Sequence, residues 1–357
     1  MRPRTPLAGA YAAAARGWRD VLGWDYPAAF GDAADEHRRV RTDVGVFDFS
    51  FMTHVVVGGR DGLELVQRLV TNDARRLTFG GALYAPMCDE AGGMVDDCTV
   101  IRIDDGYLLT TGLCSTARWI AEQARGLDVR LDDRSSAIAV VAVQGPRSLE
   151  TLLKVGVEMN ADLAYFSAAA AKAAGAEVLV ARIGYTGELG YEVFAPPVAP
   201  FDLWRTLARD GTSCGADALD SLRIEAGYRM TQVDFDRTMS PYEAGLDAFV
   251  RPDKGPFVGR DALISAKPRR RLIGLRMEDA RLATARGADV WDMAGAVVGR
   301  VTSACVSPTL GGTLAFAYVA TGVEGPFRID GVRGTAEARP LPFYDRERRC
   351  VRGLAAR

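Results

Sequence analysis

The amino-acid sequence predicts an α+β fold, and three observations lead to that prediction. The chain has 357 residues, which is too long for one ordinary domain and enough for two or three. Hydrophobic residues make up 48% and charged residues 25% of it, as in globular proteins with a substantial core. Strand-like and helix-like segments alternate without a regular βαβ order, which favours α+β over a parallel α/β fold.

In the first 125 residues, apolar periodicity separates the expected helices from the expected strands. The expected helices span residues 11–21, 32–44, 61–69 and 115–124. Asp61 stands where it can cap the third of these helices. The expected strands span residues 54–59, 82–88, 94–103 and 106–111. Glycine turns separate the last three strands, which is the pattern of antiparallel hairpins.

The rest of the chain continues this pattern and then changes to short strands. Strands are expected at 137–143 and 176–183, and helices at 148–155, 168–174, 200–208 and 216–230. The polar, proline-containing stretch 265–271 reads as a linker, the alternative being a solvated loop inside one domain. Beyond it, strands at 272–277, 296–303, 312–318, 327–329 and 334–338 predict a small β-barrel or sandwich.

Charge and composition narrow the function classes. The formal net charge of −2 gives no positive field for nucleic acid or an anionic membrane. No apolar run approaches the roughly 20 residues that span a bilayer, and the N-terminus lacks the apolar core of a signal peptide. We therefore expect a cytoplasmic protein. The six cysteines form no CxxC pair, so free thiols are expected rather than a disulfide framework or a zinc site.

Histidine is scarce, since His37 and His54 are the only two in the chain. Two histidines are few for a histidine-based nucleophilic mechanism or for a zinc site with His and Cys ligands. No metal site is therefore predicted. Carboxylates, tyrosines and arginines are the expected carriers of the chemistry.

Two glycine-containing segments are candidates for a site. In the first, residues 92–97, a glycine turn leads into a strand on which Asp96 and Asp97 point to opposite faces. The alternative is a turn with two solvated acids. In the second, residues 184–192, glycines allow close approach of a ligand, and Tyr185 and Glu192 flank the loop. The alternative is an ordinary surface hairpin.

A third candidate segment lies on a helix, at residues 220–227. Asp220 and Arg223 are three residues apart and share one face, so they can pair. The alternative is a helix-surface ion pair of little energetic weight. Gly227 costs about 1 kcal/mol inside a helix, which indicates close packing or ligand approach.

Together these segments resemble the glycine-cleavage T-protein (aminomethyltransferase) superfamily. The resemblance extends over nearly the whole chain and includes residues 45–52, 71–73, 240–246 and 253–260. It implies a three-domain cloverleaf around a central funnel that holds tetrahydrofolate. The implied domains are residues 1–52 with 140–250, which bind folate, a second α+β domain at 53–139, and a C-terminal β-barrel at 270–357.

The resemblance also implies roles for individual side chains. The residues that would bind folate are Met52, Tyr84, Asp97, Tyr185, Glu192 and Arg223. A carboxylate such as Glu192 can accept from the pterin N3–H and 2-amino group together, and Arg223 can donate to the pterin carbonyl or the folate tail. Asp97 would be catalytic, near the reacting N5–N10 edge, where it can steady a cation or move a proton. Asp97 is preferred to Asp96 from its spacing to Tyr84 in the family pattern.

Two stretches depart from the family pattern. Residues 230–234 replace a frequent aromatic–glycine pair, and residues 283–288 lack the usual apolar–proline pattern. We therefore expect a tetrahydrofolate-dependent one-carbon transferase that demethylates a small substrate onto folate. Segment 241–246 also resembles the corresponding segment of folate-dependent demethylases.

Three alternatives remain open. The first is the aminomethyltransferase of glycine cleavage, which needs a lipoyl carrier protein. The second is one-carbon transfer from folate to a small metabolite. The third, from another class, is a folate-binding accessory protein for iron–sulfur assembly; it is disfavoured because residues 254–260 contain no cysteine.

Overall fold

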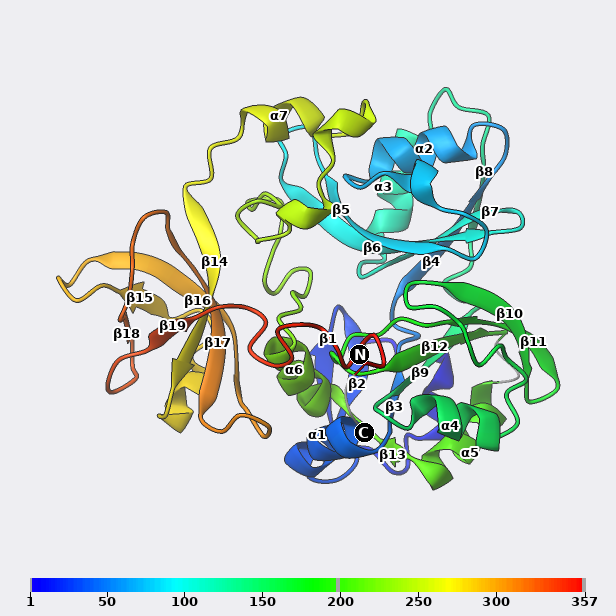
Figure 1. Ribbon diagram of the computed structural model, residues 1–357, viewed down its shortest axis with the longest axis horizontal. Coiled ribbons are helices and arrows are strands. Elements are labelled where there is room, and N and C mark those ends of the chain that lie inside the picture. The colour runs from blue at the N-terminus through cyan, green and yellow to red at the C-terminus, as the bar shows by residue number, and fades with distance from the viewer. Residues whose placement is uncertain (1, 197–199, 355–357) are drawn as a thin grey trace.

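Three larger β-sheets organise the computed structural model, which describes residues 2–196 and 200–354 (Figure 1). Three short stretches lie outside the described residues. They are residue 1 and residues 197–199, in the predicted first domain, and residues 355–357, at the end of the predicted third domain. A separate N-terminal hairpin is formed by β1 (Arg16–Val21) and β2 (Trp24–Ala29), after a 3-10 helix at Pro6–Ala10.

The first sheet has the strand order β10-β11-β12-β9-β3-β13 and is antiparallel except for the pairing of β13 with β3. Its strands are β3 (Gly45–Asp48), β9 (Ala139–Gln144), β10 (Ala168–Ala173), β11 (Ala176–Ala181), β12 (Gly190–Ala195) and β13 (Thr212–Ser213). Its helices are α1 (Ala33–Thr42), α4 (Ser148–Lys154), α5 (Pro200–Asp210) and α6 (Ala216–Glu225). Helices α4 and α5 pack on one face, whereas α1 and α6 contribute to the core on the other face.

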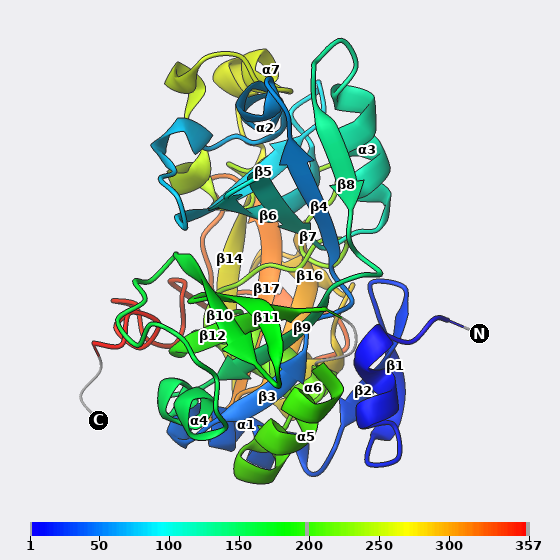
Figure 2. The same cartoon turned by 90° about the vertical axis from the view of Figure 1, so that its right-hand side faces the viewer.

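The second sheet, of order β5-β6-β7-β4-β8, lies above the first in Figure 2. Its strands are β4 (Thr53–Gly58), β5 (Ala82–Cys88), β6 (Met94–Ile103), β7 (Gly106–Thr111) and β8 (Arg130–Asp133), with helices α2 (Gly62–Leu69) and α3 (Ser115–Gln123). Apolar side chains of β4, β6 and β7 join the core between this sheet and the first. This shared core places β5 and β6 next to the loops that leave the first sheet.

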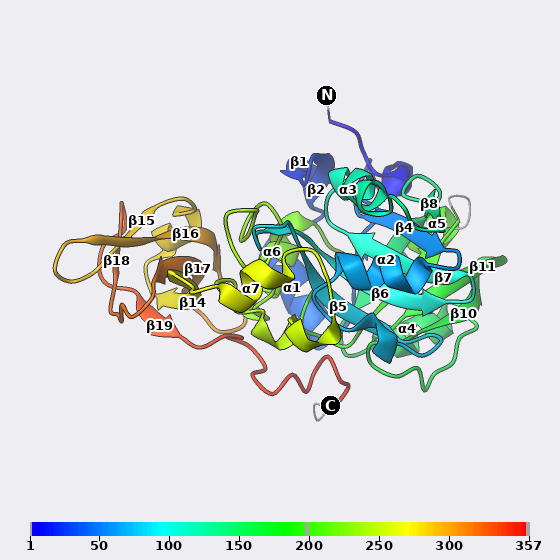
Figure 3. The same cartoon turned by 90° about the horizontal axis from the view of Figure 1, so that it is seen from above.

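The third sheet, of order β18-β15-β16-β17-β14-β19, curls into a half-barrel at one side of the molecule (Figure 3). Its strands are β14 (Arg270–Met277), β15 (Asp289–Trp291), β16 (Val297–Val306), β17 (Thr313–Ala320), β18 (Arg328–Ile329) and β19 (Glu337–Arg339). The α+β class and the C-terminal barrel-type sheet are confirmed. Between α6 and the third sheet lie α7 (Arg260–Ser265) and 3-10 turns at Asp247–Phe249 and Pro252–Lys254. Two further 3-10 turns lie within the second and third parts of the fold, at Ala74–Arg76 and Ala280–Thr284.

Three expected helices are wrong in whole or in part. Residues 11–21 end in strand β1, which pairs with β2 around a turn at Leu22 and Gly23. The alanine run at 168–174 forms strand β10. The helix expected at 216–230 ends at Glu225, because Gly227 adopts a left-handed φ of 74° and stops it.

Two smaller expectations also change. The expected linker is shorter than predicted, since α7 continues to Ser265 and β14 begins at Arg270. The side chain of Asp61 does not cap α2; its Oδ2 accepts from the backbone N–H of Asp128 at 2.8 Å. Within the described residues, no helix is both long enough and apolar enough to cross a membrane.

Candidate functional site

Tyr84 and Asp97 form the centre of the candidate site on two paired strands, β5 and β6. The Tyr84 hydroxyl donates a hydrogen bond to Oδ2 of Asp97 at 2.8 Å. Burial raises the pKa of the Asp97 carboxyl, and the neighbouring charge of Asp96 raises it further, while the bond from Tyr84 opposes both. Asp97 is thus a carboxyl group that can hold a proton at higher pH than an ordinary aspartate.

Asp96 and Asp97 have different environments although they are neighbours. Asp96 is fully buried, and its Oδ2 accepts from the backbone N–H of Leu113 at 3.0 Å and from the hydroxyl of Thr116 at 2.7 Å. Its Oδ1 accepts from the backbone N–H of Asp97. Asp96 therefore anchors the start of α3, whereas the carboxyl of Asp97 has Tyr84 as its one hydrogen-bond donor among the described side chains.

Glu192 is a buried carboxyl group without a partner in the part of the chain that the structure describes. It lies on β12, is 5% exposed, and has Ala142 and Ala181 as its neighbours across the sheet. Burial raises its pKa to about 8. A buried acid normally has a hydrogen-bond partner, because removing it from water is costly. The position is therefore suited to a ligand that brings its own donors.

Met52 and Tyr185 lie on the same side of the first sheet as Glu192. Side chains alternate along a strand, and Phe194, two residues after Glu192, belongs to the core cluster against which Met52 and Tyr185 pack. The Tyr185 hydroxyl donates to the backbone carbonyl of Arg229 at 2.6 Å. The ring of Tyr185 stacks on that of Tyr228, with centroids 5.6 Å apart and planes 16° apart.

The glycines of the 184–192 loop have a structural reason of their own. A Cβ on Gly184 or Gly190 would lie 2.0 or 2.3 Å from Oε1 of Gln144. Both glycines therefore make room for the buried Gln144 side chain, and the expectation that they admit a ligand is not needed to explain them.

Arg223, predicted to bind folate, is largely occupied by the protein itself. Its Nε donates to Asp220 at 3.0 Å, its Nη1 donates to Asp234 and to the carbonyl of Tyr228, and its Nη2 donates to Ser303 at 2.7 Å. A guanidinium has five N–H groups, so at most one is left for a ligand. The expected pairing with Asp220 is confirmed, and the contact with Ser303 joins α6 to the third sheet.

Arg229 is a residue that the sequence interpretation missed. It follows the end of α6, in the stretch that was expected to be helical. Its Nη1 donates to the carbonyl of Gly227 at 2.7 Å, while its Nε is buried and finds no partner in the described part of the chain. The glycine at 227 was the available signal, since a glycine ending the helix there places Arg229 in a loop.

Electrostatic effects show which of these groups lie close together. Burial raises the pKa of Tyr84, the charge of Asp97 raises it further, and the positive charge of Arg229 opposes both. Burial also raises the pKa of Tyr185, on which the charges of Arg223 and Asp97 act in opposite directions. Tyr185 therefore links the Tyr84–Asp97 pair to the side of the first sheet that carries Met52 and Glu192.

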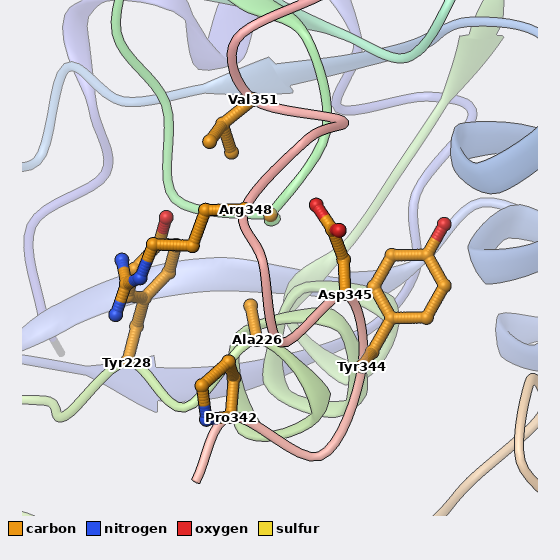
Figure 4. Close-up of a pocket in the computed structure, with 8 residues that line it drawn as sticks. Ala226, Tyr228, Pro342, Tyr344, Asp345, Arg348 and Val351 are labelled. Carbon is orange, nitrogen blue, oxygen red and sulfur yellow. The ribbon is translucent and has the colours of Figure 1, made fainter. Parts of the chain in front are cut away.

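The C-terminal segment lies beside Tyr228, as Figure 4 shows. A small pocket of about 10 Å³, roughly the space of one water molecule, lies between Ala226, Tyr228 and residues 342–351. Figure 4 shows the side chain of Arg348 beside Tyr228, and its Cζ is 5.7 Å from the ring centre. The last described residues thus help to enclose the Tyr185–Tyr228 stack.

Two family models match the chain. The model of the GCVT N-terminal domain matches residues 7–254, and that of the glycine cleavage T-protein C-terminal barrel domain matches residues 270–345. Among curated relatives, the aminomethyltransferase of Moorella thermoacetica is 37% identical over 97% of this chain and 99% of its own. The aminomethyltransferase of Streptomyces coelicolor is 35% identical over 97% of this chain and 98% of its own.

A solved structure shares this architecture. The glycine cleavage system aminomethyltransferase T from Bartonella henselae superposes with a TM-score of 0.89 at 25% sequence identity. The superposition covers 96% of this chain and 98% of that chain. The similarity therefore includes all three sheets and the loops between them.

Proposed function

Because the chain belongs to the glycine cleavage T-protein family, we propose that it transfers the carbon of an aminomethyl group to tetrahydrofolate. Membership of this family shows that the chain is a one-carbon transferase that works with tetrahydrofolate. The observation that supports a folate site in this chain is Glu192, a buried carboxyl group whose hydrogen-bond partner is absent from the described protein residues.

The side chains present fit a reduced folate. The pterin edge carries an N3–H and an amino group side by side, and a carboxylate accepts from both. Met52 and Tyr185 offer apolar and aromatic surface on the same side of the sheet as Glu192. Folate supplies amine nitrogens that can take up a one-carbon unit. Asp97 is the proposed catalytic group, because its raised pKa lets it hold or release a proton near neutral pH.

Tyr84 is the proposed positioning residue for Asp97. Its hydroxyl donates to Oδ2 of Asp97 at 2.8 Å and is the one side-chain donor to this carboxyl among the described residues. In glycine cleavage the aminomethyl group arrives on a lipoyl carrier protein, so such a carrier is the proposed macromolecular partner. We retain the cytoplasm as the proposed location; the six cysteines carry free thiols, as they would there.

A second candidate function is demethylation of a small substrate onto folate, which was the leading expectation from the sequence. It is favoured by the departure at residues 230–234. There Gln232 has a left-handed φ of 58°, a conformation that glycine adopts without strain. The adjacent Thr231 packs beside the aspartate pair: a Cβ on Gly112 would lie 2.5 Å from Cγ2 of Thr231 and 3.3 Å from Oδ1 of Asp96. A changed side chain at this place alters the substrate end of the site.

Binding and turnover separate the roles of Glu192 and Asp97. Calorimetry with tetrahydrofolate should give micromolar binding to the wild type and roughly 10- to 100-fold weaker binding to Glu192→Gln, because a charge-assisted pair is lost. Asp97→Asn should bind folate nearly normally and lose most turnover with an aminomethyl-loaded lipoyl carrier. Glu177→Gln, an exposed glutamate on the adjacent strand β11, is the matched control.

The donor then identifies the reaction. Formation of methylene-tetrahydrofolate and ammonia from the loaded carrier supports aminomethyl transfer. Activity with N-methylated small molecules alone supports the demethylation candidate. If the wild type bound no tetrahydrofolate, or if Asp97→Asn kept full turnover, the proposed site would be wrong.

A further inference from the structure

Arg229 is a largely enclosed cation without a carboxylate partner among the described residues. Burial lowers the pKa of its guanidinium. Nη1 donates to the carbonyl of Gly227 at 2.7 Å. Within residues 2–196 and 200–354, Nη2 reaches only the carbonyl of Gly245, at 3.5 Å, and Nε has no partner. The Nε–Nη2 edge of the guanidinium is therefore almost unused, and this is an edge that binds carboxylates in bidentate fashion.

Asp234, an acid whose charge raises the pKa of Arg229, does not serve as its hydrogen-bond partner. Oδ2 of Asp234 accepts from Nη1 of Arg223 and from the backbone N–H of Met230. Its Oδ1 accepts from the hydroxyls of Thr302 and Ser303 at 2.6 Å. The acceptor positions of this carboxylate are thus filled, and the positive charge of Arg229 is left for a ligand.

A second unpartnered donor lies near Arg229 on the third sheet. Tyr318 on β17 is 4% exposed, and its hydroxyl has no hydrogen-bond partner among the described residues. Burial raises the pKa of Tyr318, and the charges of Asp234 and Arg229 act on it in opposite directions. A buried hydroxyl and a buried guanidinium edge, both without partners, are costly unless a ligand satisfies them.

The surroundings carry further positive charge. Arg348 is near enough for its charge to lower the pKa of Arg229, and it too has no carboxylate partner in the described part of the chain. Tyr84, the hydrogen-bond donor to Asp97, also interacts with Arg229. The cationic edge therefore lies beside the group to which we assign the proton chemistry.

We propose that Arg229, together with the hydroxyl of Tyr318, binds a carboxylate of a ligand in the one-carbon site. The inference rests on the proposed function, since it assigns a subsite of the same site. Two ligands can supply that carboxylate: the glutamate tail of folate, or a carboxylate on the one-carbon donor, such as an N-methylated amino acid. A donor carboxylate would make the subsite a determinant of substrate specificity.

Paired ligands distinguish the two sources. Tetrahydrofolate is compared with 6-methyltetrahydropterin, which has the reduced pterin ring but lacks the p-aminobenzoyl-glutamate tail. N-methylglycine is compared with N-methylethanolamine, in which an alcohol replaces the carboxylate. Each is titrated calorimetrically into the wild type, Arg229→Met and Tyr318→Phe. Arg102→Met is the control, because Arg102 donates to the carbonyl of Gly106, lies over the Tyr107 ring and has no carboxylate partner among the described residues.

Each outcome has a definite meaning. Weaker binding of tetrahydrofolate to Arg229→Met by about tenfold or more, with 6-methyltetrahydropterin unchanged, assigns the carboxylate to the folate tail. Weaker binding of N-methylglycine by a similar factor, with tetrahydrofolate and 6-methyltetrahydropterin unchanged, assigns it to the donor. Tyr318→Phe should show the same selectivity with a smaller effect. If Arg229→Met fails to fold, Tyr318→Phe alone shows which ligand supplies the carboxylate.

The proposal is overturned if these variants leave both carboxylate ligands bound as in the wild type, or if they weaken the tail-less pterin as much as tetrahydrofolate. Absence of tetrahydrofolate binding to the wild type is a different result. It would count against the proposed function and leave the Arg229 subsite to be judged on N-methylglycine alone.

Discussion

At the scale of single residues, the candidate site is defined by groups whose charge the protein leaves without a partner. Among the described side chains, Glu192 has no donor, Asp97 has one, and Arg229 keeps an unused edge. By contrast, Asp96 and Arg223 are equally polar and buried, but their hydrogen bonds are made within the protein. A buried polar group without a partner costs free energy in the ligand-free state, and we therefore propose these groups as the positions that bind a ligand.

The raised pKa of Glu192 makes a pH-dependent prediction. Because burial raises this pKa to about 8, from about 4.3 in the unfolded chain, the folded state binds an extra proton between these values. The free energy of unfolding should therefore fall as pH rises from about 5 to 8 and level off above that range. Urea unfolding at several pH values measures how the free energy of unfolding changes with pH. Glu192→Gln should reduce this slope by the contribution of up to one bound proton.

Saturating tetrahydrofolate provides the second arm of this measurement. Donors on the ligand favour the carboxylate form, so the bound protein should lose most of the slope that Glu192 causes. A wild-type slope that Glu192→Gln leaves unchanged would show that another group titrates in this range.

At the scale of elements, the sequence predicted strands well where turns bracket them. Strands β5, β6 and β7 have the predicted bounds, because glycine turns fix where each strand ends. The alanine run at 168–174 was predicted to be a helix because alanine has the highest helix propensity. It forms β10 because it pairs along its length with β11 around a two-residue turn, and this long-range pairing is not visible in local composition.

The sequence also predicted some residues of the candidate site and missed others. The family pattern pointed to Tyr84 and Asp97, which the structure joins by a hydrogen bond. It did not show that the partners of Arg223 lie within the protein, since Asp234 and Ser303 are 11 and 80 residues away. Arg229 was missed because its place depends on where α6 ends. The end of one helix therefore decided which arginine remains available.

The hairpin between β10 and β11 carries an element-scale prediction. Ala174 and Gly175 form its turn with φ of 48° and 75°, a type I′ geometry that strongly favours Asn-Gly. Ala174→Asn should raise the free energy of unfolding by roughly 0.5–1 kcal/mol, because asparagine tolerates the left-handed conformation better than alanine. Chemical denaturation measures the change.

Position specificity separates a turn effect from a general effect of asparagine. Ala170→Asn, at an exposed position of the same strand, should lower stability slightly because asparagine disfavours strands. Equal effects of the two substitutions would contradict the explanation from turn geometry.

At the scale of the whole molecule, a buried charged network joins the first sheet to the third. Glu225, at the end of α6, accepts from Nη2 of Arg41 at 2.8 Å and from the hydroxyl of Ser307 in the loop after β16. Arg41 in turn donates to the carbonyl of Thr186 at 2.8 Å and to Glu188 at 3.0 Å. The half-barrel and the loop that carries Tyr185 are therefore held by the same two side chains.

Glu225→Gln tests whether this network or apolar packing holds the half-barrel in place. Burial opposes the charge of Glu225, but the hydrogen bond from His37 and the charge of Arg41 lower its pKa to about 2. The carboxylate thus stabilises the fold above its unfolded pKa of about 4.3, and this contribution is lost as pH falls toward 2. Substitution should cost roughly 3 kcal/mol at neutral pH and remove that acid-dependent loss. Calorimetric unfolding should also broaden or split, because the half-barrel separates earlier.

The matched control is Glu337→Gln, which breaks an exposed pair with Arg339 on β19 and should cost less than about 1 kcal/mol. An apolar cluster also lies between α6 and the third sheet; it includes Ile224, Leu314 and Phe316. If Glu225→Gln were no more destabilising than the control, that cluster would be sufficient to hold the half-barrel. The network would then serve to fix the Tyr185 loop, and Glu225→Gln should weaken folate binding without lowering stability.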